Sequence, residues 1–243
     1  METVRVVTYN VHKCRGLDRR VRPERIAAVL RETGGDVIAL QEVLSIEGKG
    51  HEHHQARYIA EALGMDYCIG ENRRLYGGAY GNVTLSCLPV VKAENFDITW
   101  RGRERRGCLR TDVQLKAGGT LHVFNIHLGT AYIERRHQGR RLVGGEILNK
   151  DDLKGPRVVM GDFNEWTWGL ASRLLSSHFE SADVRYHLRS ARTYPGILPL
   201  VHLDHVYYDN RLELKRLVLH RSRTALIASD HLPLVADFYV RHS

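Results

Sequence analysis

Val4-Arg5-Val6-Val7-Thr8-Tyr9-Asn10-Val11 and Asp36-Val37-Ile38-Ala39-Leu40-Gln41-Glu42-Val43 are the stretches that decide the fold class of this chain. Both are apolar at nearly every inner position, which is typical of strands covered on both faces. Between them, Arg22-Pro23-Glu24 predicts a helix start, because proline is favoured in the first turn, and Ile26 and Leu30 share one face of that helix. The segment is therefore a strand, helix, strand unit.

The rest of the chain alternates short strand-like runs with fewer helical ones. Apolar residues at helical spacing before Gly64 predict a second helix that ends at Leu63. Further helices are predicted over residues 132–149 and 170–176. Strands are predicted over residues 65–69, 82–88, 90–98, 108–115, 120–128, 157–160, 200–208, 214–220 and 232–240. Ala117-Gly118-Gly119 predicts a hairpin between two of them.

These elements indicate one α/β domain over residues 1–243, because no linker, low-complexity tract or fixed repeat divides the chain. Two packed mixed β-sheets flanked by helices would accommodate so many strands. The pattern alone does not distinguish that sandwich from a single large mixed sheet.

Composition narrows the class of protein. The 243 residues carry 36 basic and 28 acidic side chains, a formal charge of +8, and a charged fraction of 26% beside 43% hydrophobic residues excludes a disordered or fibrous chain. The longest apolar runs are much shorter than the ~20 residues that cross a bilayer, and the N-terminus lacks the pattern of a secretory signal. We therefore expect a cytoplasmic protein without a transmembrane segment. Four widely spaced cysteines predict neither a zinc site nor a disulfide framework.

Polar side chains stand at or just beyond the ends of six apolar strands. The segments are Tyr9-Asn10-Val11-His12, Gln41-Glu42-Val43, Asn125-Ile126-His127, Gly161-Asp162-Phe163-Asn164, Leu203-Asp204-His205 and Ser229-Asp230-His231. Strand ends at one sheet edge can converge even when distant in sequence, and ligands bind there in open sheets. The sequence therefore predicts one site built from six strand ends.

The residue types suit phosphoester hydrolysis. Carboxylates supply the hard oxygen ligands that Mg²⁺ or Mn²⁺ prefers, histidines titrate near neutrality, and amides orient a water or a phosphoryl oxygen. These groups are Glu42, Asp162, Asp204, Asp230, His127, His231, Asn10 and Asn164. Each alone has an ordinary structural explanation; Gly161-Asp162-Phe163-Asn164, for example, also suits an Asx turn. Their joint occurrence in this order favours a function.

At these motifs the chain resembles the endonuclease/exonuclease/phosphatase family, which includes deoxyribonuclease I, exonuclease III and neutral sphingomyelinases. The resemblance runs from Thr8-Tyr9-Asn10-Val11-His12 to Ser229-Asp230-His231-Leu232-Pro233, with the intervening motifs in family order. It implies a four-layered α/β sandwich and a metal-dependent phosphoester hydrolase. By the same resemblance, Glu42 binds the divalent metal, Asn10 lies beside it and Asp230 belongs to its shell.

The resemblance also implies the catalytic roles. Asp162 and Asn164 would orient the attacking water and the phosphate, and His231, positioned by Asp204, would activate the nucleophile or stabilise the transition state. His127 would lie near the phosphoryl oxygens. Whether His231 or Asp162 takes the proton from water stays open. A metal that neutralises charge while a base deprotonates an in-line water is sufficient chemistry for phosphodiester hydrolysis.

Two departures from the family pattern concern individual histidines. The acid that supports the first histidine in deoxyribonuclease I has no clear counterpart here, and Asn82 is nearest in order. We therefore expect His127 to be less strongly polarised. His205 is additional to the pattern and receives no role.

The sequence leaves the phosphoester open. The positive charge and basic loops favour nucleic acid, since arginines contact backbone phosphates without reading bases, and Arg106 could instead face the scissile phosphate. Trp166 and Trp168, which follow Asn164, would suit a phospholipid headgroup or a stacked ring if exposed, and core packing if not. We expect a monomeric, nuclease-like phosphodiesterase. The alternatives are a phospholipid or inositol-phosphate phosphodiesterase or phosphatase and, less favoured, a binding module of the same fold.

Overall fold

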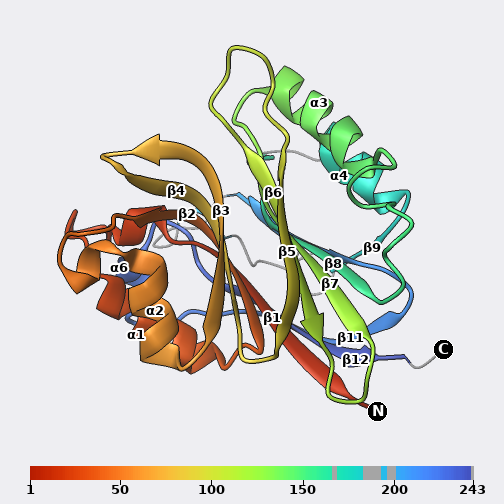
Figure 1. The fold of residues 1–243 in the computed structure, drawn as a ribbon, viewed down its shortest axis with the longest axis horizontal. Helices are drawn as coiled ribbons and strands as arrows, with labels where there is room; N and C mark the ends of the chain where they lie inside the picture. The colour runs from red at the N-terminus through yellow and green to blue at the C-terminus, as the bar shows by residue number, and fades with distance from the viewer. Residues whose placement is uncertain (166–168, 183–192, 196–200, 242–243) are drawn as a thin grey trace.

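Two six-stranded mixed sheets lie face to face in the computed structural model, which describes residues 1–165, 169–182, 193–195 and 201–241 (Figure 1). The first sheet has the strand order β11 (Leu212–Leu219), β12 (Leu234–Val240), β1 (Thr3–Asn10), β2 (Val37–Ser45), β4 (Gly78–Ser86), β3 (Asp66–Leu75). The second has the order β5 (Val90–Asp97), β6 (Gly107–Gln114), β7 (Thr120–His127), β8 (Arg157–Asp162), β10 (Asp204–Tyr208), β9 (Glu180–Ser181).

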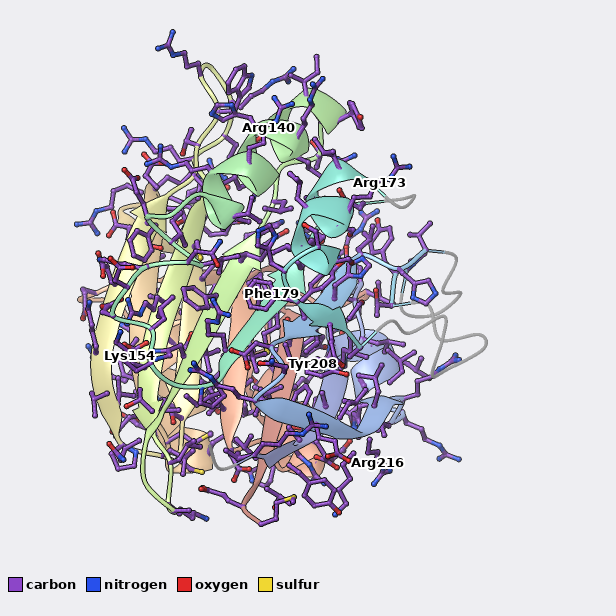
Figure 2. The ribbon with its side chains drawn as sticks, turned by 90° about the vertical axis from the view of Figure 1, so that its right-hand side faces the viewer. Arg140, Lys154, Arg173, Phe179, Tyr208 and Arg216 are labelled. Atoms are coloured by element: carbon purple, nitrogen blue, oxygen red, sulfur yellow. The ribbon has the colours of Figure 1, made fainter. Side chains whose placement is uncertain are left out.

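Helices cover the outer face of each sheet. Helices α1 (Pro23–Thr33), α2 (Gln55–Leu63) and α6 (Ala225–Ala228) pack on the first sheet. Helices α3 (Tyr132–Val143) and α4 (Leu170–Ser176) pack on the second, and Figure 2 shows them from the outside with the labelled Arg140 and Arg173. Single 3₁₀ turns, η1 (His12–Cys14) and η2 (His51–His53), follow β1 and precede α2. The expected four-layered sandwich is confirmed, and the single large sheet is not formed.

Strand β1 shows why both faces had to be apolar. Val4 and Val6 point into the core between the sheets, and Val7 and Tyr9 point into the core under the helices. Burying each such side chain contributes roughly 1.5–3 kcal/mol. Towards the end of the strand the inner face turns polar, and Asn10 is buried there with 2% exposure.

The topology brings the predicted strand ends to one edge. β1 and β2 are parallel and joined through α1, while β7 and β8 are parallel and joined through α3, so all four end at this edge. β12 runs antiparallel to β1, and β10 runs antiparallel to β8, so both begin there. Four strand ends and two strand starts therefore meet at the same place.

The boundaries differ from prediction where glycine intervenes. The predicted helix over residues 132–149 ends at Val143, because Gly144 and Gly145 follow and glycine disfavours helix continuation. The strands predicted over 65–69 and 82–88 extend towards each other and form a hairpin across Tyr76-Gly77, whose φ angles of 51° and 81° suit a two-residue loop. The hairpin predicted at residues 117–119 is confirmed by the β6–β7 pairing. Within the described ranges, no helix is both long and apolar enough to cross a bilayer.

Candidate active site

Asn10 connects the two sheets at the converging edge. Its Nδ2 donates to Glu42 Oε1 at 3.3 Å and to Asp162 Oδ2 at 2.9 Å, and its Oδ1 accepts from the backbone nitrogen of His12 at 3.0 Å. Glu42 belongs to the first sheet and Asp162 to the second. The side chain of Asn10 is therefore a hydrogen-bonded bridge between Glu42, the candidate metal ligand, and the candidate catalytic carboxylate of Asp162.

Glu42 has an unusual backbone that aims its carboxylate into the site. Its φ is 58°, in the left-handed region that non-glycine residues avoid at a cost of about 1–2 kcal/mol. The strain coincides with a shift in the β2–β4 register between Leu40 and Val43. A bulge at this point re-aims a side chain that regular pleating would direct elsewhere. Such strain is concentrated at functional sites in proteins generally.

Lys13, which the sequence analysis did not single out, contacts Glu42. Its Nζ lies 2.8 Å from Glu42 Oε2. The contact depends on η1, where His12, Lys13 and Cys14 all have positive φ, between 44° and 58°. Burial alone would raise the pKa of Glu42, but the charge that His127 carries when it is protonated, the charge of Lys13, and the hydrogen bonds from Lys13 and Asn10 outweigh burial and hold this pKa well below its usual value. Glu42 is therefore ionised at neutral pH.

Asp162 lies at the centre of a row of functional groups across the second sheet. The strand register places it directly between His127 on β7 and Asp204 on β10. Its Oδ2, besides accepting from Asn10, lies 3.6 Å from His127 Nε2 and 3.7 Å from His231 Nε2. Burial raises the pKa of Asp162, against the opposing charges of the two histidines.

Gly161 is required for this placement. Its φ is 149°, and a Cβ there would lie 1.9 Å from the carbonyl oxygen of Ile126 on the neighbouring strand. Only glycine lets β8 approach β7 so closely.

His231 and Asp204 form a buried pair. His231 Nδ1 lies 2.8 Å from Asp204 Oδ2, and the two side chains are 6% and 0% exposed. Burial would lower the pKa of His231, but the neighbouring carboxylates of Asp204 and Asp162 raise it to about 10. In this arrangement His231 is an imidazolium at neutral pH. Contacts of 3.3, 2.9 and 3.7 Å link Glu42 to His231 through Asn10 and Asp162, so the two side chains lie within about 10 Å of each other.

Among the residues that the structure describes, the side chain that contacts the second ring nitrogen of His127 is an arginine, not an acid. Arg106, on the loop between β5 and β6, places Nη1 3.1 Å from His127 Nδ1 and pairs through Nη2 with Glu104 at 2.9 Å. Burial first, and the Arg106 charge second, lower the pKa of His127 to about 4. A neutral His127 that accepts at Nδ1 carries its proton on Nε2, towards Asp162. Asn82, the nearest counterpart by order, instead donates to the backbone of Gly107 and Asn125.

The other predicted site residues have these positions. Asp162 Oδ1 accepts from the Asn164 backbone nitrogen at 2.8 Å, and Asn164 Nδ2 donates to the Leu128 carbonyl, so this motif includes an Asx turn. Asp230, 27% exposed in its side chain, lies 3.5 Å from His12 Nδ1. Trp166 and Trp168 lie outside the described residues. His205 packs edge-on against Phe163.

A buried polar layer, which the sequence analysis did not identify, fixes the two sheets against each other beneath the site. Gln41 of β2 donates to Asn125 Oδ1 of β7 at 2.9 Å, and Asn125 Nδ2 donates to the carbonyls of Leu40 and Val83 at 3.0 and 2.9 Å. Gln41 and Asn125 are fully buried. Such a layer stabilises one relative position of the sheets, because any slip would leave these groups unpaired.

The oxygen atoms of Glu42 and Asn10 suit a hard cation that needs few ligands from the protein. Among the described residues, no three His, Cys, Asp or Glu side chains form a closed metal cage. Mg²⁺ usually keeps several waters and binds through one or two carboxylates, so an ionised Glu42 beside the Asn10 amide is a sufficient anchor.

Comparisons with known proteins agree on one family. The sequence profile described as "Endonuclease/Exonuclease/phosphatase family" matches residues 7–231. An uncharacterized protein of Escherichia coli, YbhP, is 30% identical over 97% of this chain and 96% of its own length.

Solved structures share the fold. An endonuclease/exonuclease/phosphatase from Beutenbergia cavernae superposes with a TM-score of 0.78 and 24% identity, over 99% of this chain and 72% of its own. D. rerio TDP2, solved with a single-strand DNA product, has a TM-score of 0.74 and 16% identity, over 99% and 100%. Together with the profile match across the strand-end motifs, these likenesses lead to one conclusion: the chain belongs to the endonuclease/exonuclease/phosphatase family of phosphoester hydrolases.

Proposed function

We propose that this protein is a phosphodiesterase that uses Mg²⁺ or Mn²⁺. The observation that carries the proposal is the grouping around Asp162 Oδ2, where one carboxylate oxygen has an amide at 2.9 Å and two imidazoles at 3.6 and 3.7 Å. Four charged or polar side chains, those of Asp162, Asn10, His127 and His231, therefore lie together at the converging edge, an arrangement suited to handling a phosphate and a water together.

Glu42 and Asn10 would hold the metal, with Asp230 as a further candidate. When bound, the metal would neutralise negative charge on the phosphate and on the leaving oxygen. The protein supplies the remaining functions through fixed donors and acceptors, which need no reorganisation during the reaction.

The pKa directions support a division of labour between the residues. Asp162, whose pKa is raised by burial, is suited to accept the proton of the attacking water. His231, whose pKa is raised to about 10, is suited to stabilise the developing negative charge or to protonate the leaving alcohol. Neutral His127 would donate from Nε2 to a non-bridging oxygen. In the reaction a water oxygen bonds to phosphorus, one P–O ester bond breaks, and a phosphomonoester and an alcohol leave.

Nucleic acid remains one predicted substrate, supported by the charge of +8 and by the DNA product held by the structural relative TDP2. The test of catalysis itself uses bis(4-nitrophenyl) phosphate with Mg²⁺ or Mn²⁺, with EDTA, and with the variants His231→Ala and Glu42→Ala. We expect EDTA to abolish turnover and each variant to lower kcat by about 100-fold or more. Turnover that survives EDTA, or near-normal rates in both variants, would contradict the proposal.

A further inference from the structure

A cavity of about 580 Å³ adjoins the site on the first sheet. It lies among η1 and the loop after it, the end of β2, η2 and the β3–β4 hairpin, whose turn lies at the upper left of Figure 1. Lys13 connects the cavity to the candidate active site, because its side chain lines the cavity and its Nζ contacts Glu42 at 2.8 Å. A molecule whose phosphate lies at Glu42 can therefore extend into this cavity.

The apolar part of the lining is mainly aliphatic. Leu44, Ile46 and Leu75 form it as half-buried side chains, and Val21 and Tyr76 stand at the rim with 54% and 77% exposure. The lining holds two rings, those of Tyr76 and His53, beside the aliphatic side chains of Val21, Leu44, Ile46 and Leu75, so it offers less surface for stacking bases than for apolar contact. Aliphatic walls of this kind suit hydrocarbon chains.

The polar part of the lining is mainly cationic. It holds Lys13, Arg15, Arg19 and Arg73, against the single carboxylate of Glu52. Lys13 and Arg73 are neutralised by Glu42 and by Glu104, which lies 2.9 Å from Arg73. Within the part of the chain that the structure describes, Arg15 and Arg19 form no ion pair, and Arg15 Nε donates only to the Arg19 carbonyl. Two uncompensated cations favour a ligand with net negative charge.

Resting on the phosphodiesterase activity proposed above, we propose that this cavity binds the aliphatic chains of an anionic phospholipid-like phosphodiester. The phosphate would then lie beside Glu42, and Arg15 and Arg19 would select the substrate by its net charge. The cavity volume falls in the ordinary range for small-ligand sites, roughly 300–1,000 Å³. More apolar surface continues along the same edge, where the backbone of Leu17 hydrogen-bonds that of Ile227 and their side chains are 40% and 44% exposed.

The test compares three phosphodiesters on the metal-loaded full chain. Dihexanoyl-phosphatidylglycerol is anionic, dihexanoyl-phosphatidylcholine is zwitterionic, and bis(4-nitrophenyl) phosphate has no aliphatic chain. Val21→Asp puts a charge at the cavity rim, and Val91→Asp is its control, because Val91 is 57% exposed on edge strand β5 of the other sheet. We expect Val21→Asp to lower kcat/KM for the anionic lipid about 10-fold and to leave bis(4-nitrophenyl) phosphate unchanged. Val91→Asp should change neither.

A second pair of variants tests the charge selection. Wild-type protein should prefer the anionic to the zwitterionic lipid, and the double variant Arg15→Gln, Arg19→Gln should lose most of that preference. The double variant Arg173→Gln, Arg216→Gln has the same net charge and changes only exposed arginines outside the cavity lining, so it should keep the preference. If Val21→Asp failed to fold, Tyr76→Ser at the exposed hairpin turn would replace it, with a smaller loss expected.

The outcomes separate the two proposals. Absence of metal-dependent turnover of bis(4-nitrophenyl) phosphate would defeat the phosphodiesterase proposal itself. Turnover of that compound with no lipid hydrolysis, or with lipid rates insensitive to Val21→Asp and Tyr76→Ser, would defeat only the lipid cavity. Oligonucleotide hydrolysis that is lost in Val21→Asp would show that the cavity holds nucleic acid, which also overturns the lipid proposal.

Discussion

Replacing Asp204 with asparagine should change the pH dependence of stability, and the expected size follows from the buried pair with His231. The folded pKa of His231 is about 10, against 6.5 for the free side chain. Because the folded value is the higher one, the charged pair stabilises the fold fully below about pH 6.5, and that stability is lost as pH rises towards 10. The difference between these two pKa values corresponds to at most roughly 5 kcal/mol of folding free energy, to which all the carboxylates around His231 contribute.

Asp204→Asn removes the nearest of these charges without changing side-chain size. We expect it to lower the free energy of unfolding by about 3 kcal/mol at pH 6, the scale of a broken buried ion pair, and by much less at pH 9.5. Urea unfolding in EDTA at the two pH values measures this. NMR titration of the His231 ring, assigned with His231→Gln, should show its pKa falling by about two pH units or more in the variant.

Asp209→Asn is the matched control. Asp209 is buried and pairs with Arg157 at 3.0 Å, and arginine stays charged across this range. Its cost in stability should therefore be nearly the same at pH 6 and pH 9.5. The reasoning would be refuted if Asp204→Asn lowered the free energy of unfolding equally at pH 6 and pH 9.5, or if the pKa of His231 in the wild-type protein were below 7.

Three further predictions concern Gly161, Asn125 and Arg106. Gly161→Ala should destabilise the fold by about 3 kcal/mol or more in urea unfolding, because its Cβ would meet the Ile126 carbonyl at 1.9 Å. Asn125→Leu should cost roughly 3–5 kcal/mol by the same measurement, since it removes three buried hydrogen bonds between the sheets, one accepted from Gln41 and two donated to the carbonyls of Leu40 and Val83. Arg106→Gln should raise the pKa of His127 from about 4 towards its ordinary value in an NMR titration, because the guanidinium charge that disfavours the imidazolium is gone.

Each of these has its own control. Gly119→Ala tests a glycine with no atom within 4 Å of the added Cβ, so only its positive φ should matter and its cost should be smaller. Gln114→Leu changes an amide on the neighbouring strand β6 that donates to the Gly119 carbonyl in an exposed turn, and it should cost well under 1 kcal/mol. Arg103→Gln removes an exposed arginine of the same loop as Arg106, and it should leave the pKa of His127 unchanged. Equal effects in a variant and its control would contradict the corresponding explanation.

The chain's local patterns were sufficient to predict that the polar strand ends converge at one edge. A strand covered on both faces is apolar throughout, so the polar group that interrupts it, as at Asn10 or Asp162, is conspicuous in the sequence. The role of Gly161 was not predicted, because the sequence analysis interpreted Gly161-Asp162-Phe163-Asn164 as a turn, and the close approach of β8 to β7 depends on how the strands pair. The number of predicted strands was compatible with a two-sheet sandwich but did not distinguish it from one large sheet. The spacing of hydrophobic residues along a strand does not indicate which other strand it pairs with.

The pairings inside the site were decided by tertiary structure alone. The sequence offered no supporting acid for His127 and only Asn82 as the nearest counterpart in order, whereas Arg106 contacts this histidine in the structure. The contact of Lys13 with Glu42 was likewise found only in three dimensions. Both contacts join segments that are distant in sequence, and the second depends on positive φ angles at η1 and Glu42 that no residue preference indicates. Hydrophobic pattern is a local, periodic property of the chain. Contact between two polar side chains depends on strand register and on strain that the packing of both sheets imposes, so it exists only once the fold is complete.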